Sequence, residues 1–109
     1  MRIVTRQQLL EMPRGTLFAE AFDPCNYGPL CIFGGEFGPD FTERSITACE
    51  SDGSEQYIER SQEMWETGAS YPVNTDYGRE GMFDDSMRYL VYEPADIESI
   101  ISELHRGQS

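Results

Sequence analysis

Four glutamates recur at three- and four-residue intervals, which places them on one face of a predicted helix. They are Glu55, Glu59, Glu63 and Glu66. Like charges at this spacing weaken a helix by about 0.2–0.5 kcal/mol per pair, and within the segment only Arg60 can offset them. The stripe serves one of two purposes, and the sequence leaves both open: solubility of the chain, or docking on a basic groove of another molecule.

A second set of acidic residues lies in and just before a predicted loop at residues 78–86. Its members are Asp76, Glu80, Asp84 and Asp85. The set lacks the alternating oxygen ligands, central glycine and distal glutamate of a calcium-binding loop. No two of its carboxylates can be placed across a cleft for glycoside hydrolysis. We therefore predict an exposed loop that joins the four helix glutamates in a partner-binding surface.

Residues that could act as nucleophiles or metal ligands are few and poorly spaced. The single histidine, His105, falls in the last turn of a terminal helix, where it is badly placed to serve a serine or cysteine nucleophile as a base. Cys25, Cys31 and Cys49 lack the close cysteine pairs of zinc sites. The glycine-rich stretch 34–38 is not followed by the Gly-Lys-Ser/Thr of a phosphate loop. The sequence predicts a protein that is not an enzyme and carries neither metal nor cofactor.

All eight basic residues are arginines. Arginine binds phosphate through two hydrogen bonds at once and stacks on aromatic rings, so arginines and aromatics together offer an alternative site for a nucleotide. The members of this alternative ligand-binding set are Arg14, Arg44, Arg79, Arg88, Tyr27, Tyr77 and Trp65. The negative charge of the whole chain opposes an anionic ligand of this kind.

The composition excludes several classes of partner. The 109 residues include 20 Asp or Glu, and the formal net charge is -12. Direct binding to nucleic acid or to an anionic membrane is disfavoured, because both need clustered positive charge. No run approaches the roughly 18 consecutive apolar residues of a membrane helix. The first 35 residues are neutral, and the acidic excess falls in residues 36–66 and 76–103, which suggests one acidic face.

Hydrophobic periodicity and capping residues predict three helices. The first covers residues 6–12 and is capped by Thr5. The second begins with a capping box at Asp52 and Glu55 and ends at Gly68, and an apolar face opposes its glutamates. The third begins at Glu93-Pro94 and ends at Gly107, with an apolar stripe at the i, i+3, i+4, i+7 spacing. The two apolar faces comprise Tyr57, Ile58, Ser61, Met64 and Trp65 in the second helix, and Ile97, Ile100, Ile101 and Leu104 in the third.

Strands are predicted at residues 16–22, 30–33 and 41–48, and residues 70–77 and 87–92 read as an antiparallel pair. The sum is a single acidic α+β domain over residues 1–109. It would hold about five short, mostly antiparallel strands in one sheet, with three helices packed on one face. An exposed strand edge near residues 30–33 leaves the oligomeric state open between monomer and homodimer.

As a whole, the chain resembles a family of small, largely uncharacterised bacteriophage and prophage proteins. The residues that carry this resemblance are Thr5-Arg6, Leu10, Pro13, Gly15-Thr16-Leu17-Phe18, Pro24-Cys25, Gly28, Ile32, Asp40-Phe41, Glu66-Thr67-Gly68, the run from Asp76 to Asp84, and the run from Val91 to Ile97. The resemblance covers nearly all of the chain but supplies no catalytic residue and no cofactor. It implies a phage setting, in which small acidic proteins often antagonise host defences.

These observations together predict a non-enzymatic, anti-CRISPR-like inhibitor in the cytoplasm of an infected bacterium. Its acidic face would mimic nucleic acid and occupy the basic groove of a host defence protein, without binding nucleic acid or membrane itself. Two alternatives remain open. One is a sponge that sequesters a nucleotide immune signal through the arginine and aromatic set. The other is an immunity protein against a basic nuclease toxin. The odd number of cysteines agrees with a reducing compartment.

Overall fold

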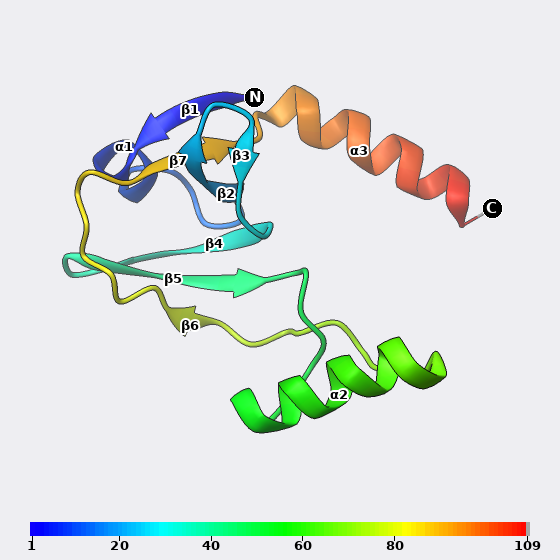
Figure 1. Cartoon of the computed structure of the whole chain (residues 1–109). Coiled ribbons are helices and arrows are strands. Elements are labelled where there is room, and N and C mark those ends of the chain that lie inside the picture. The colour runs from blue at the N-terminus through cyan, green and yellow to red at the C-terminus, as the bar shows by residue number, and fades with distance from the viewer. Residues whose placement is uncertain (109) are drawn as a thin grey trace.

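A twisted, antiparallel sheet organises the protein in the computed structural model, which describes residues 1–108 (Figure 1). In chain order the elements are β1 (Arg2–Thr5), α1 (Arg6–Leu10), β2 (Leu17–Asp23), β3 (Asn26–Tyr27), β4 (Cys31–Phe37), β5 (Asp40–Ser45), α2 (Ser54–Thr67), β6 (Gly78–Arg79), β7 (Arg88–Val91) and α3 (Pro94–Gly107). The strand order is β1-β7-β2-β4-β5-β6, and β3 pairs with β2. The predicted α+β class is confirmed, but the described sheet has seven strands where about five were predicted.

β1 is a strand that the sequence analysis missed. It pairs with β7 in the register Arg2↔Val91 to Thr5↔Arg88, and Val4 within it is buried. A signal was present, because Ile3, Val4 and Thr5 are all β-branched and such residues favour strands. At its end Thr5 also caps α1: its hydroxyl accepts the backbone N–H of Gln8, and the Gln8 side chain accepts the N–H of Thr5. The predicted cap is confirmed.

The strand predicted at residues 87–92 is confirmed as β7, but its predicted partner is wrong. Residues 70–77 form only an isolated bridge between Val73 and Cys49. β7 instead lies between β1 and β2, with Phe18 opposite Val91 and Ala21 opposite Arg88. β1 and β2 occupy both edges of β7, so the segment that follows α2 cannot pair with β7. It pairs instead at the other end of the sheet, where β6 lies against β5.

The core lies on one face of the sheet and is mainly aromatic. Phe18, Phe33, Phe41 and Tyr89 come from four different strands, and their ring centroids are 5.6–6.5 Å apart in mostly edge-to-face contacts. Such contacts stabilise a core beyond the area they bury. Leu9 of α1 is fully buried against this cluster, so α1 closes the core from one side.

The two long helices do not pack on the sheet, and the prediction of three helices on one face is wrong for them. None of the residues of α2 or α3 is buried. Figure 1 shows α2 below the sheet and α3 projecting away from its upper edge. Strand side chains and Leu9 of α1 make up the buried core without a contribution from either long helix. The predicted apolar faces therefore end in solvent, as at Trp65 and Leu104, which are 90% and 60% exposed.

Candidate partner-binding site

The four predicted glutamates all lie on α2, and each of them is exposed. The termini of α2 agree only in part with the sequence prediction. Gly68 ends the helix in the left-handed conformation (φ 73°), as predicted. The capping box at Asp52 is wrong: Gly53 is the N-cap, and the N–H of Asp52 donates to Gln56 Oε1 at 2.8 Å.

Polar contacts made by Arg60 and Glu63 anchor α2 to the rest of the protein. Arg60 Nη1 donates to the carbonyl oxygen of Glu50 at 2.7 Å, and its guanidinium lies 4.7 Å from the ring centroid of Tyr71. The Tyr71 hydroxyl donates to Glu63 Oε2 at 2.6 Å, and this bond raises the pKa of Tyr71. Gln56 and Met64 are half-buried on the same side of α2 as Arg60. Of the predicted apolar face, Ser61 and Met64 are half-buried, whereas Tyr57, Ile58 and Trp65 are exposed.

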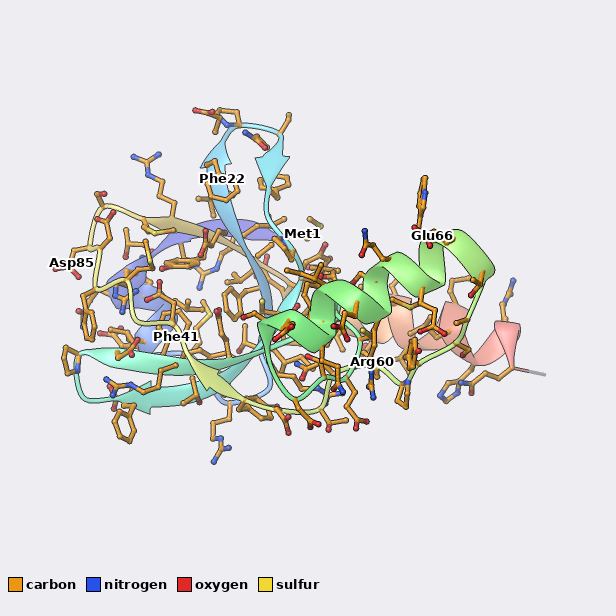
Figure 2. The ribbon with its side chains drawn as sticks, turned by 60° about the horizontal axis from the view of Figure 1, so that its bottom comes forward. Met1, Phe22, Phe41, Arg60, Glu66 and Asp85 are labelled. Atoms are coloured by element: carbon orange, nitrogen blue, oxygen red, sulfur yellow. The ribbon has the colours of Figure 1, made fainter. Side chains whose placement is uncertain are left out.

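The outward side of α2 combines charge with large apolar side chains. Ile58 follows Glu55 by three residues, and Trp65 follows Ile58 by seven, so both lie beside the acidic stripe. Ile58 is 59% exposed and Trp65 is 90% exposed. Figure 2 shows Arg60 and Glu66 on different sides of α2, which separates the anchoring side from the outward side. We call the outward side the α2 ridge; it consists of Glu55, Ile58, Glu59, Glu63, Trp65 and Glu66, with Glu63 at the border to the anchoring side, where Tyr71 donates to it.

The loop acids do not continue the α2 ridge. Asp76, Asp84 and Asp85 are exposed, but Figure 2 places Asp85 at the opposite end of the molecule from Glu66. Asp84 Oδ1 accepts hydrogen bonds from the hydroxyl and the N–H of Ser86, at 2.7 and 2.9 Å, and these bonds lower the pKa of Asp84. The structure therefore has two separate acidic regions where the sequence suggested one acidic face.

Glu80, the fourth predicted loop acid, is not a surface group. Its side chain is 2% exposed, and its Oε1 accepts from Arg6 Nη1 at 2.7 Å and from the N–H of Met82 at 3.1 Å. Its Oε2 is buried and has no hydrogen-bond partner among residues 1–108. Glu80 therefore cannot contribute to docking on the outside of the loop.

Arg6 lies at the centre of a buried ionic network that the sequence analysis did not identify. Besides Glu80, its guanidinium contacts Asp40 Oδ1 at 3.7 Å and donates to the Tyr89 hydroxyl at 3.3 Å. Asp40 also accepts the Nε–H of Arg79 at 3.0 Å. Burial raises the pKa of Asp40, but hydrogen bonds from the N–H of Gly81, the N–H of Phe41 and Arg79 outweigh it, and the net shift is downward. Asp40 is therefore held as a carboxylate.

Two further carboxyls face this network from the sheet. Burial is the main reason that the pKa of Glu43 rises to about 7, and the charges of Glu80, Glu20 and Asp40 raise it further. Burial, and then the charge of Glu80, raise the pKa of Glu20. The register places Glu20 directly opposite Tyr89. The interior of the sheet thus gathers more acidic groups than Arg6 and Arg79 can neutralise.

The arginine and aromatic residues of the alternative set do not converge on one site. Arg14 packs its side chain against Gly35, and Arg44 donates to the carbonyl oxygen of Asn74 at 2.9 Å. Arg79 pairs with Asp40 and lies over the ring of Phe37. Of the remaining members, Trp65 is on α2 and Tyr77 packs near Gly34. Only Arg88 and Tyr27, among the described members of the set, line one groove, beside β2.

Across the described residues 1–108, no three His, Cys, Asp or Glu side chains converge in a way that could hold a metal ion. Cys25, Cys31 and Cys49 are free thiols. Within the same part of the chain, no helix has both the length and the apolar surface needed to cross a membrane. Comparison of the protein with family models, with curated proteins and with solved structures finds no match.

Proposed function

We propose that the protein is a non-enzymatic inhibitor that docks through the α2 ridge on the basic groove of a nucleic-acid-handling protein. The observation that carries this proposal is the exposure of α2: no residue of the helix is buried, and Trp65 is 90% exposed beside four glutamates. A helix that contributes little to its own core is free to serve a partner.

The exposed tryptophan supports docking over solubility as the purpose of the acidic stripe. A surface selected for solubility avoids exposed tryptophan and isoleucine, yet Trp65 and Ile58 lie beside the glutamates. Tryptophan is the residue type most enriched at the energetic centres of protein interfaces. The α2 ridge therefore has the composition of an interface, with apolar anchors next to charges.

The charges of the α2 ridge suit a groove that ordinarily holds DNA or RNA. Residues four apart on a helix are separated by about 6 Å along its axis, so the glutamates form a line of negative charges. Such a line speeds association with a basic surface and selects against acidic ones. We propose a bacteriophage setting, a location in the host cytoplasm and a CRISPR effector as the target, on the basis of the resemblance described above. The dispersed arginines give no support to a nucleotide sponge.

Two variants of equal charge test the proposal. The ridge variant carries E55Q, E59Q, E63Q and E66Q. The control variant carries E11Q, E36Q, E98Q and E103Q, four exposed positions outside α2. Both have a net charge four units less negative, so only the position of the lost charge differs. The readout is inhibition of DNA cleavage, and binding, by purified CRISPR effectors of the natural host.

We expect the ridge variant to bind the effector at least about tenfold more weakly than the wild type, mostly because it associates more slowly. The difference in affinity between the two proteins should depend steeply on the salt concentration, because salt screens the glutamate charges. The control variant should bind within about twofold of the wild type. Equal binding by both variants, with folding verified by circular dichroism, would contradict docking through the α2 ridge. Wild-type protein that inhibits none of the effectors would contradict the target class.

A further inference from the structure

A groove on the opposite side of the molecule from the α2 ridge lies between the β2–β3 hairpin and the chain that leads into β7. Its volume is about 880 Å3. We call it the hairpin groove; Figure 2 shows Phe22, one of its lining residues, on the hairpin. The side chains that give it an apolar surface are Ile3, Phe22, Tyr27, Met82 and Met87.

The apolar side chains of the hairpin groove are exposed to an unusual extent. Phe22 is 56% exposed and Met82 is 64% exposed, and Ile3 and Tyr27 are also exposed. Contiguous exposed apolar residues on a small protein commonly mark an interaction site. Methionine is well suited to such a surface, because its flexible thioether adapts to different partners.

Carboxylates surround this apolar surface. Glu20, Asp23 and Asp84 line the hairpin groove, against Arg88 as the one basic lining residue in the described part of the chain. Glu20 and Asp84 lie near the apolar Met82, so a ligand that fills the groove meets both kinds of surface. The charge balance favours an occupant with a positive charge.

The buried carboxylate of Glu80 does not line the hairpin groove but is connected to it through Met82. The N–H of Met82 donates to Glu80 Oε1, which ties Glu80 to a residue that lines the groove. Glu80 Oε2 is buried and has no partner within residues 1–108. A buried carboxylate oxygen without a donor is costly, and most such atoms in proteins are satisfied by some partner. The charge of Glu80 also acts on Glu20 in the groove and raises its pKa, secondary to burial.

We propose that the hairpin groove binds a peptide segment of another protein in which an arginine or lysine stands between apolar residues. The cationic group would lie against the carboxylates of Glu20 and Asp84, which line the groove. The flanking apolar side chains would cover Phe22, Tyr27 and Met82. This site is separate from the α2 ridge, and the inference does not depend on the proposed function. A bare metal ion does not fit, because no three carboxylates of the described chain converge to hold one.

The test uses two pentapeptides that differ in one charge: acetyl-Gly-Leu-Arg-Leu-Gly-amide, and the same peptide with citrulline in place of arginine. Citrulline keeps the shape of arginine but is neutral. Each is titrated into 15N-labelled full-length protein and followed by amide chemical shifts. We expect the arginine peptide to shift the amides of Glu20, Phe22, Met82 and Asp84. The citrulline peptide should bind at least about tenfold more weakly, because it loses the charge-assisted hydrogen bonds.

Two protein variants sharpen the result. Glu20→Gln should weaken binding of the arginine peptide about fivefold or more. Glu98 is an exposed acid on α3 outside the groove, so Glu98→Gln should leave the affinity for this peptide unchanged within twofold. The ridge variant should also bind the peptide normally, so a failure of the α2 ridge and a failure of the hairpin groove are distinguishable. Equal affinity for the two peptides would overturn the proposal. The proposal would also be overturned if the amide chemical shifts of the groove residues changed with protein concentration in the absence of peptide. That result would identify a second copy of the protein as the occupant.

Discussion

At the scale of single residues, Arg6 connects parts of the protein that are distant along the chain. Its guanidinium is 1% exposed and donates to Glu80, Tyr89 and the carbonyl oxygen of Pro39. In the sequence, Arg6 is merely the first residue after a helix cap, where an arginine is usually exposed. Its burial could not be predicted, because it depends on partners 33 to 83 residues away.

Replacing Arg6 tests whether this network holds the fold together. Arg6→Met should lower the free energy of unfolding by about 3–5 kcal/mol, because it leaves Glu80 as a buried charge without its ion-pair partner, whereas Asp40 keeps Arg79. Urea denaturation measures the change. The exposed Arg88→Met in β7 is the matched control and should change stability by less than about 0.5 kcal/mol. Adding Glu80→Gln to Arg6→Met should recover part of the loss, and a double variant no more stable than the single one would argue against the charge explanation.

Glu43 gives the stability of the protein a pH dependence opposite to that of Asp40. The pKa of Glu43 is about 7 in the folded protein, above its ordinary value of 4.5. A raised pKa means that folding favours the protonated carboxyl. The stabilisation is therefore complete below about pH 4.5 and is lost as the pH rises through 7.

The variant Glu43→Gln removes this titration. It should match the wild type near pH 4.5 and be more stable at pH 8, by about 1–2 kcal/mol after allowance for the partial exposure of the carboxyl. Urea unfolding at several pH values measures the difference, and Glu36→Gln in the neighbouring strand is the exposed control. If the difference in free energy of unfolding between Glu43→Gln and the wild type were constant over this pH range, Glu43 would titrate at its ordinary pKa.

At the scale of secondary structure, most local signals of the sequence held, with the capping box at Asp52 as an exception, and the long-range ones did not. The cap at Thr5, the stop at Gly68 and the proline at the start of α3 depend on neighbours within a few residues, and all three are confirmed. Hydrophobic periodicity predicted which faces of α2 and α3 are apolar. Periodicity cannot predict whether the sheet packs against those faces. The same limit applies to the acidic residues: the exposure of the α2 glutamates followed from their helix, whereas the burial of Glu80 depends on Arg6.

Gly34 in β4 is an element-scale feature with a measurable consequence. β4 carries an extra residue opposite β5 between Phe33 and Gly35, a β-bulge at which the ring of Tyr77 approaches the backbone. A Cβ on Gly34 would lie 2.7 Å from Tyr77 Cδ2 and would also overlap Thr42.

Gly34→Ala should therefore lower the free energy of unfolding by about 1–3 kcal/mol, because neighbouring strands must shift to make room. Thermal or urea denaturation measures it. The control is Gly78→Ala in β6, where an added Cβ meets no atom within 4 Å. Equal effects of the two substitutions would indicate a general cost of changing glycine and not a close approach at the bulge.

At the scale of the whole molecule, the protein is extended for its length. The radius of gyration is 15.3 Å, whereas a compact domain of about 100 residues has roughly 13 Å. The difference reflects α2 and α3, which stand away from the sheet (Figure 1). The acidic residues are spread in the same way, over the helices and the loop before β7.

Charge repulsion within one molecule destabilises the folded state of a protein this acidic. With a net charge of -12, raising the salt concentration from 20 mM to 0.5 M should screen the repulsion and raise Tm by about 4 °C, which corresponds to about 1 kcal/mol. Differential scanning calorimetry measures the shift. The control variant E11Q, E36Q, E98Q and E103Q, with its lower net charge, should gain less. A Tm that falls with salt would show that exposed ion pairs outweigh the repulsion.

β1 pairs only with β7 among the described strands, and this affects folding during synthesis on the ribosome. β1 ends at Thr5, and its partner is complete only at Val91. At the usual pace of the ribosome, about 5–20 residues per second, the first strand waits roughly 4–17 s for its partner. During this delay its β-branched residues remain an open edge that can join another nascent chain. A chain that stops before Arg88 would therefore lack β7, and its first strand would have no partner in the sheet.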